Sequence, residues 1–174
     1  MQIYDNRGNV TIAVNAPKQN KVNFMSKYFE DFSIGDQYRT PAKTITEAAI
    51  TIMIGLGGLT SPLFVDEEYA RTTPFCSRIA PGRLTLLVMG GLEEQVGLYN
   101  ETVIALLGLD KIRFKEPLRA GDTIHVEMEI VELKETSKPD RGIVVHRSTC
   151  LNQKGEVVVE SETTHMIKRR PNKY

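Results

Sequence analysis

The stretch Ile124-His125-Val126-Glu127-Met128-Glu129-Ile130 alternates apolar and polar side chains without a break, and it indicates the architecture of the chain around it. Successive side chains of a β-strand point to opposite faces of its sheet. The alternation therefore predicts a strand with one face on a core and the other in water. The same period continues over residues 143–151 and 156–167, which are separated by Asn152-Gln153-Lys154-Gly155, a polar loop with the glycine typical of hairpins. From Thr102 onward we predict four long strands in an antiparallel meander.

The residues before these strands carry helical signals. Thr44-Ile45-Thr46-Glu47 has the spacing of a capping box, in which a threonine oxygen accepts from an early helix amide and the glutamate reaches back. Gly57-Gly58 is expected to end this helix. Its apolar stripe is formed at helical spacing by Ile50, Met53, Ile54 and Gly57.

A second long helix is expected to begin at Gly82, and a short one over Asp66 to Arg71. A strand near Gln37 to Lys43 precedes both. The fold class is therefore α+β, a single antiparallel sheet wrapped around a central helix. The face of that helix expected to meet the sheet comprises Leu84, Leu87, Val88, Gly91 and Leu92.

The chain divides into one compact domain with two short ends. Residues 1–24 are rich in asparagine and lack periodicity, so we predict a loosely ordered or disordered N-terminal extension. An ordered hairpin from Val10 to Val14 is the alternative. The domain then covers residues 25–170, with Met25 as a second possible translation start, and residues 171–174 form a tail.

Composition narrows the range of partners. The 174 residues include 22 Lys and Arg against 22 Asp and Glu, so the net charge is zero and neither nucleic acid nor a membrane surface is an expected partner. Cys76 and Cys150 lie far apart and outside any C-x-x-C pair, which speaks against a zinc site or a disulfide framework. Two free thiols suit the reducing cytoplasm. We expect no metal and no cofactor.

Common catalytic motifs are missing from the sequence. Gly55-Leu56-Gly57-Gly58 suggests a dinucleotide loop, but Thr60 stands where the third glycine belongs and no strand precedes it. The sequence contains no phosphate-binding loop, no H-E-x-x-H and no G-x-S-x-G. The loop between the two long helices remains as the candidate site.

That loop and its flanks resemble the MaoC-like acyl-CoA hydratase/dehydratase family, the enoyl-CoA hydratase 2 branch of the hot-dog fold. The resemblance covers about Tyr28 to Lys168 in family order and spacing. It rests on Tyr28-Phe29-Glu30-Asp31-Phe32-Ser33-Ile34-Gly35-Asp36, Thr44-Ile45-Thr46-Glu47-Ala48, Pro62-Leu63-Phe64-Val65-Asp66-Glu67-Glu68-Tyr69-Ala70, Thr73-Pro74-Phe75, Arg78-Ile79-Ala80-Pro81-Gly82 and Pro117-Leu118-Arg119-Ala120-Gly121-Asp122-Thr123.

The resemblance also shows where this chain departs from the family. The family loop D-x-N-P-L-H-x-D-E-x-Y-A supplies an Asp and a His that activate water for addition to an enoyl thioester. In this chain the Asp position is Leu59, the Asn position is Ser61 and the His position is Phe64. Leucine and phenylalanine cannot exchange protons, so the catalytic dyad is degenerate.

The resemblance also suggests a substrate-binding role for four residues, of which Gly82 is the glycine that the family retains. The backbone N–H of Gly82 is expected to polarise the thioester carbonyl from a helix N-terminus. Arg83 is expected to meet an anionic acyl or phosphate group, while Ser61 and Phe64 are expected to contact substrate. Ser61 and Asp66 are the substitutes considered for the missing dyad. The structural alternative is that Asp66 and Glu67 cap the short helix. A structural ion pair is likewise expected for Arg78.

Three hypotheses about function follow. The leading one is a MaoC-like protein that binds acyl-CoA or acyl-carrier thioesters, with hydratase/dehydratase (lyase) ancestry and a non-catalytic or divergent site. By resemblance it forms a hot-dog homodimer, or a heterodimer with a dyad-bearing homologue. The alternatives are a hot-dog thioesterase that uses Asp66 or Glu67, and a non-enzymatic acyl-binding module lined by Leu59 and Phe64.

Overall fold

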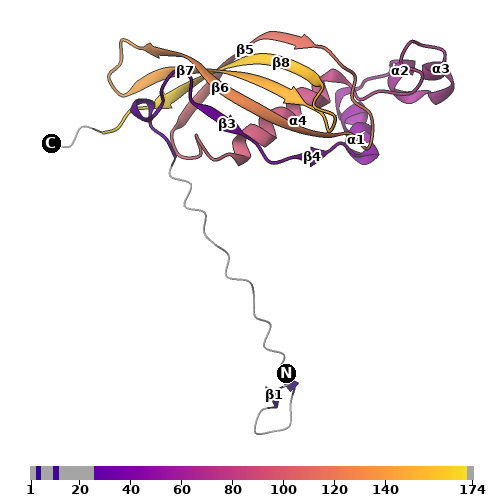
Figure 1. Ribbon diagram of the computed structural model, residues 1–174, viewed down its shortest axis with the longest axis horizontal. Coiled ribbons are helices and arrows are strands. Elements are labelled where there is room, and N and C mark those ends of the chain that lie inside the picture. The colour runs from indigo at the N-terminus through magenta and orange to yellow at the C-terminus, as the bar shows by residue number, and fades with distance from the viewer. Residues whose placement is uncertain (1–2, 5–9, 12–25, 172–174) are drawn as a thin grey trace.

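A six-stranded antiparallel sheet curves around one long helix in the computed structural model of this chain, which describes residues 3–4, 10–11 and 26–171 (Figure 1). The main path of the sheet runs in the order β3-β6-β7-β8-β5, with β4 paired to the end of β6. The strands are β3 (Gln37–Arg39), β4 (Lys43–Thr44), β5 (Val103–Phe114), β6 (Thr123–Glu135), β7 (Arg141–Leu151) and β8 (Val157–Lys168). The predicted α+β architecture is confirmed.

The predicted meander is right for three strands and wrong for the fourth. β6, β7 and β8 follow one another through hairpins, with Met128 opposite Ser148 and Ser148 opposite Ser161. β5 pairs with β8 instead of β6. The physical reason is that the other edge of β6 is already occupied by β3 and β4, whose Gln37 and Lys43 lie opposite Glu129 and Ile124. β5 therefore adds to the far side of the sheet.

The first long helix, α1 (Glu47–Gly57), ends as expected, because Gly58 takes up the left-handed conformation with φ 59°. Its start differs from the capping-box prediction. The capping residue is Thr46, whose hydroxyl accepts from the Ala49 N–H at 3.1 Å. Thr44 belongs to β4, where the backbone is extended and its hydroxyl lies 2.8 Å from that of Thr123.

The predicted strand over residues 37–43 is interrupted. It splits into β3 and β4 around Thr40 to Ala42, where Pro41 has no N–H to offer a neighbouring strand. The loop between the long helices holds two short helices, α2 (Pro62–Val65) and α3 (Glu67–Arg71). The prediction located α3 and missed α2.

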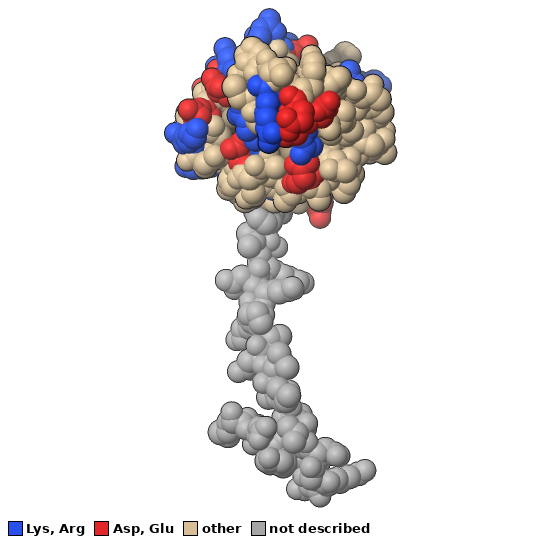
Figure 2. All heavy atoms as spheres, turned by 90° about the vertical axis from the view of Figure 1, so that its right-hand side faces the viewer, with Lys and Arg blue, Asp and Glu red and all other residues tan. Residues whose placement is uncertain are grey.

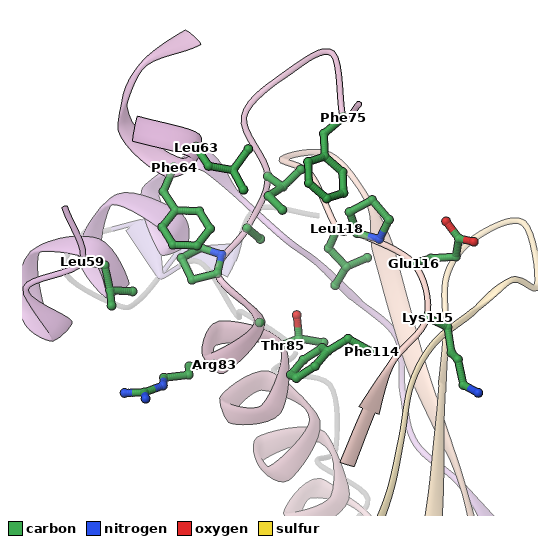
Figure 3. Close-up of a pocket in the computed structure, with 15 residues that line it drawn as sticks. Leu59, Leu63, Phe64, Phe75, Arg83, Thr85, Phe114, Lys115, Glu116 and Leu118 are labelled. Carbon is green, nitrogen blue, oxygen red and sulfur yellow. The ribbon is translucent and has the colours of Figure 1, made fainter. Parts of the chain in front are cut away.

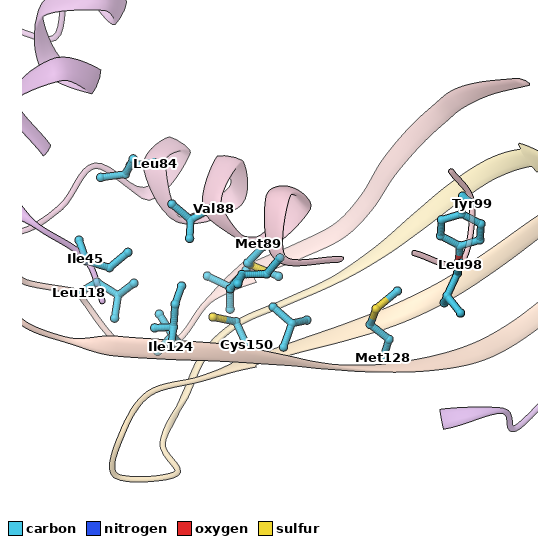
Figure 4. Packing of buried hydrophobic residues seen from close by; sticks show 14 of the residues in the cluster. Ile45, Leu84, Val88, Met89, Leu98, Tyr99, Leu118, Ile124, Met128 and Cys150 are labelled. Atoms are coloured by element: carbon cyan, nitrogen blue, oxygen red, sulfur yellow. The ribbon is translucent and has the colours of Figure 1, made fainter. Parts of the chain in front are cut away.

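The central helix is α4 (Gly82–Gln95), and it begins where the sequence predicts. Its side chains Val88 and Met89 point down onto the sheet (Figure 4), and Leu84 belongs to the same buried cluster as Ile124 and Cys150. The buried face of α4 consists of Leu84, Thr85, Val88, Met89, Leu92 and Glu93.

The predicted buried face of α4 is therefore partly wrong. Leu87 is 63% exposed and Gly91 is also exposed. The sheet covers one side of α4, so residues a third of a turn away from that side remain outside the core. The buried face observed in the structure includes two polar residues, Thr85 and Glu93, which the spacing of apolar residues cannot predict.

At the N-terminus, β1 (Ile3–Tyr4) pairs antiparallel with β2 (Val10–Thr11). The predicted extension over residues 1–24 and the tail over 171–174 lie, apart from these four residues and residue 171, outside the described residues. The alternative hairpin from Val10 to Val14 extends beyond them too. Within residues 3–4, 10–11 and 26–171, no helix is long and apolar enough to cross a membrane.

Candidate functional site

A pocket of about 540 Å³ opens at the N-terminus of α4, between the α2 region and the end of β5 (Figure 3). Its size falls in the range of small-molecule sites. The lining side chains are mostly apolar. The residues that line it are Leu59, Leu63, Phe64, Phe75, Ile79, Ala80, Pro81, Gly82, Arg83, Thr85, Phe114, Lys115, Glu116, Pro117 and Leu118.

The structure brings together four of the residues singled out in the sequence: Leu59, Phe64, Gly82 and Arg83. Leu59 follows the C-terminal cap of α1, where its N–H donates to the Ile54 carbonyl at 3.0 Å. Phe64 lies on α2, and its side chain projects into the pocket (Figure 3). Both positions are half-buried, and each contributes an apolar side chain to the pocket wall.

Gly82 is the first residue of α4, and the first N–H groups of a helix have no partner within it. Because glycine has no side chain, the ring of Phe114 can approach closely at this position. A Cβ placed there would lie 2.7 Å from Cε1 and 2.9 Å from Cζ of Phe114. The Phe114 ring therefore packs directly against the backbone at the N-terminus of the helix. The pocket combines free helix N–H groups with apolar walls, which suits a carbonyl group attached to an apolar chain.

The charged residues of the pocket do not form an acid–base pair. Arg83 and Lys115 are exposed, and Lys115 pairs with Glu160 at 3.2 Å. Glu116 is exposed as well, and in Figure 3 its side chain extends away from Leu59 and Phe64. None of the lining residues is an aspartate or a histidine. The pocket thus combines apolar walls with three exposed charged side chains, Arg83, Lys115 and Glu116.

Two predicted site residues lie outside this pocket. Ser61 is exposed and precedes α2, where its carbonyl accepts from the Phe64 N–H at 2.9 Å. Asp66 caps α3, its Oδ1 accepting from the Tyr69 N–H at 3.0 Å. Neither lines the pocket. These contacts agree with the structural alternative for Asp66, which is that it caps the short helix α3.

Comparison with known proteins identifies the family. The family described as MaoC like domain matches residues 31–150. The chain is 36% identical to the (R)-specific enoyl-CoA hydratase of Rhodospirillum rubrum over 143 residues, which cover 82% of this chain and 93% of that protein. This chain belongs to the MaoC-like family.

Solved structures agree with the fold of this MaoC-like protein. The MaoC-like dehydratase of Rhodospirillum rubrum superposes with a TM-score of 0.76 at 32% identity, over 84% of this chain and 99% of that one. RV0216 of Mycobacterium tuberculosis, described as a double hot-dog fold, superposes with a TM-score of 0.74 at 22% identity, over 86% of this chain and 46% of that one. The predicted hot-dog fold is confirmed.

Arg78 of the MaoC-like chain holds the loop in place. Its guanidinium lies 2.9 Å from Glu47 at the start of α1 and 3.2 Å from Glu67 on α3. It also donates to the Phe64 carbonyl at 3.4 Å. The hydrogen bond and charge of Glu47, followed by those of Glu67, raise the pKa of Arg78. These contacts support the predicted structural ion pair and fix the backbone that presents Phe64.

The three histidines lie on the strands, as the alternation predicts, and away from the pocket. His125 is on β6, His146 on β7 and His165 on β8. Among residues 26–171 and the four described N-terminal residues, no group of three His, Cys, Asp or Glu could hold a metal ion.

Several pocket residues could not be found from the sequence. Phe114 ends β5 and Leu118 lies in the loop that follows it, and both are more than thirty residues beyond Gly82. Thr85 lies on the buried face of α4, where apolar periodicity gives no signal for a polar residue. The resemblance covers Phe75 and Ile79 but assigns them no role. Their assembly depends on strand order, which local patterns do not encode.

Proposed function

We propose that this MaoC-like protein binds acyl thioesters of CoA or of an acyl carrier in the pocket at the N-terminus of α4, without performing the hydration typical of its relatives. One observation carries the proposal. Leu59 and Phe64 both line an apolar pocket that is bounded on another side by the N-terminus of α4. The shape of a thioester site is kept, and the groups that activate water are replaced.

The pocket has a binding role for each part of such a ligand. The thioester carbonyl accepts from the N–H groups at Gly82, where the helix dipole favours developing negative charge. Leu63, Phe64 and Phe75 surround the apolar acyl group. Arg83 is exposed at the rim and offers a cation to a carboxylate or phosphate of the ligand. A ligand of this class is supported by the activity named for the Rhodospirillum relative, an enoyl-CoA hydratase.

Hydration itself requires more than binding. Water must lose a proton as it attacks one carbon of the double bond, and the other carbon must gain one. A positioned acid and base typically contribute a factor of about 10² to 10⁴ to the rate. Leu59 and Phe64 can contribute nothing to these transfers. Oxyanion stabilisation at Gly82 alone leaves residual turnover.

Our proposal includes a second hot-dog subunit, either another copy of this chain or a homologue with an intact dyad. A protomer that binds without catalysing remains useful if its neighbour supplies the chemistry. The apolar edge strand β5 offers the surface for this pairing, with Leu106 56% and Leu107 49% exposed. The free thiols Cys76 and Cys150 are consistent with the cytoplasm as the compartment.

The thioesterase alternative receives no support from the site. Asp66 is engaged as the cap of α3, and Glu67 pairs with Arg78 and Arg71. A carboxylate that attacks or activates water must face the thioester carbonyl. Neither residue lines the pocket.

The proposal is tested by assaying the purified full chain with crotonyl-CoA and octenoyl-CoA, following loss of the enoyl chromophore and, separately, binding by calorimetry. We expect binding with only residual turnover. The double variant Leu59→Asp, Phe64→His should raise hydration by about 10²-fold or more, because it restores an acid–base pair beside Gly82.

The matched control is Leu63→Asp with Phe75→His, which introduces the same two residue types elsewhere on the pocket wall. It should leave hydration at the residual level. Rapid turnover by the unaltered chain would contradict the loss of hydration chemistry. Absence of binding to either thioester would contradict the proposed ligand class.

A further inference from the structure

The segment between α3 and α4 makes a sharp bend beside the pocket at Gly82. The Cys76 N–H donates to the Thr73 carbonyl at 3.0 Å, which closes a turn over residues 73–76. Cys76 itself takes up the left-handed conformation with φ 57°. A residue with a side chain rarely adopts this conformation, which persists where surrounding contacts impose it. The bend at Cys76 therefore needs support from outside the segment.

Arg119, in the loop between β5 and β6, supplies that support from a distant part of the sequence. Its Nη2 donates to the Phe75 carbonyl at 2.9 Å, and its Nε donates to the Ser77 hydroxyl at 2.8 Å. The two acceptors belong to the residues on either side of Cys76. Because a guanidinium is a rigid planar fork of donors, one side chain fixes both ends of the left-handed residue.

The contacts of Arg119 differ from those of the neighbouring Arg78. Glu47 and Glu67, which line the same hollow as Arg119, pair with Arg78 at 2.9 and 3.2 Å. The guanidinium of Arg119 donates instead to two neutral acceptors of one loop. Its contacts are therefore directed at the shape of that loop.

Phe75 connects this bend to the pocket. Its side chain is half-buried and lines the pocket at Gly82. In Figure 3 the ring lies near Leu118, at the end of the pocket away from Arg83. A ligand whose thioester lies at Gly82 meets this ring with a distal part of its acyl chain. The position of the Phe75 ring therefore bears on long acyl chains more than on short ones.

We propose that Arg119 is a positioning residue that sets the acyl-chain preference of the pocket. Its guanidinium fixes the bend at Cys76, and the bend holds the Phe75 ring against the distal part of the acyl chain. Arg119 itself does not line the pocket. The part of this inference that concerns ligands rests on the proposed function, whereas the effect of Arg119 on the bend stands without it.

The first test is Arg119→Lys, which keeps the positive charge but loses the fork that reaches both acceptors. Wild type and variant are titrated by calorimetry with butanoyl-CoA and octanoyl-CoA, two saturated probes that cannot be hydrated. The affinity for octanoyl-CoA should fall about 4-fold or more, the loss for roughly one methylene no longer buried. The affinity for butanoyl-CoA should stay within about 2-fold, because the shorter chain buries little surface against Phe75.

A second change separates positioning from general destabilisation. Glycine adopts the left-handed conformation without a side-chain penalty, so Cys76→Gly in the Arg119→Lys background should restore a large part of the lost octanoyl-CoA affinity. Ser77→Ala removes one of the two acceptors and should produce a smaller loss with the same preference for the longer probe. This milder variant also tests the proposal if Arg119→Lys does not fold.

Arg141→Lys is the matched control. Arg141 uses the same two nitrogens, Nε and Nη2, to donate to Asp140 at 2.7 and 2.6 Å. It does not line the pocket. The variant should leave the affinities for both probes unchanged.

Ligand-free crystal structures of the wild type, Arg119→Lys and Ser77→Ala report on the bend directly. We expect Cys76 to leave the left-handed region and the Phe75 ring to shift in Arg119→Lys. An unchanged bend in both variants, or an equal loss of affinity for the two probes, would overturn the positioning role. If the wild type binds neither acyl-CoA, the proposed function fails, and the ligand-free structures alone decide whether Arg119 holds the bend.

Discussion

Gly142 on β7 lies where another segment leaves no space for a side chain. A Cβ at this position would overlap Cγ, Cδ2 and Cε2 of Phe29, whose ring is 7% exposed and lies under the Arg169 guanidinium at 4.8 Å. Gly142→Ala should therefore destabilise the protein by about 3 kcal/mol, the upper part of the range for overpacking. Urea unfolding followed by circular dichroism measures this change.

The cause can be separated from a general intolerance of alanine. Combining Gly142→Ala with Phe29→Leu should cost at least about 1 kcal/mol less than the sum of the single changes, since the smaller side chain removes the overlap. Gly55→Ala in α1 is the control, because a Cβ there meets no atom within 4 Å. It should stabilise the protein by up to about 1 kcal/mol. A destabilising effect of Gly142→Ala no larger than that of Phe29→Leu alone would contradict the overlap.

His165 should make folding stability depend on pH. Its pKa is lowered from 6.5 to about 4 in the folded protein, by burial first and by His146 second, while the nearby Glu93 acts in the opposite direction. Between these two values the unfolded chain binds more protons, so stability is complete above about pH 6.5 and falls as the pH drops toward 4. The loss amounts to at most about 3 kcal/mol.

Urea midpoints for the wild type and His165→Phe over this pH range measure the effect as a difference, which removes the contribution of carboxylates common to both proteins. The difference between the two proteins should change steadily from pH 7 to pH 4. The His125→Phe variant should follow the wild type. Parallel pH profiles for wild type and His165→Phe would show that His165 titrates normally in the folded state.

At the scale of single elements, the start of α1 distinguishes the capping residue seen in the structure from the one expected from spacing. Thr46→Ala should destabilise the protein by about 1 kcal/mol, because the Ala49 N–H loses its acceptor. Thr44→Ala should cost less than half as much, since its hydroxyl meets only the exposed hydroxyl of Thr123. Thermal unfolding of the two variants gives this comparison directly. A larger effect at Thr44 would favour the capping box.

The elements themselves could be predicted because their signals are local. Period-two alternation located β6, β7 and β8, and a glycine in the left-handed conformation marked the end of α1. Strand order could not be predicted in the same way. The position of β5 beside β8 depends on β3 and β4 occupying the edge of β6, which is a long-range contact. The same limit applies to the site: Leu59, Phe64 and Gly82 were found, and Phe114 was not.

At the scale of the whole molecule, charge gives no single direction of association. Lys and Arg are interspersed with Asp and Glu on the face at the α1–α3 end (Figure 2), as zero net charge suggests. The apolar surface is less even. β5 lies at the edge of the sheet, and the part of it up to residue 109 is mostly apolar. The exposed apolar residues, each at least 40% exposed, are Val103, Ile104, Leu106, Leu107 and Leu109. An exposed, apolar edge strand favours pairing with another chain.

The second half of β5 carries Asp110, Lys111 and Arg113, whereas irregularities in the register with β8 occur in both halves. Charges protect an edge from pairing, so contact with a second subunit should centre on the apolar half.

Leu107→Lys should consequently shift a dimer toward monomer and raise its dissociation constant about 30-fold or more, since a charge would have to be buried at the centre of the contact. Sedimentation velocity over a concentration series measures the shift. Val65→Lys is the matched control, because Val65 on α2 is 50% exposed and lies away from β5, and it should leave the dissociation constant unchanged. If the unaltered chain is monomeric alone, the same pair of variants should be compared in mixtures with a dyad-bearing MaoC-like homologue. Equal association of Leu107→Lys and wild type in both settings would show that β5 is not the contact.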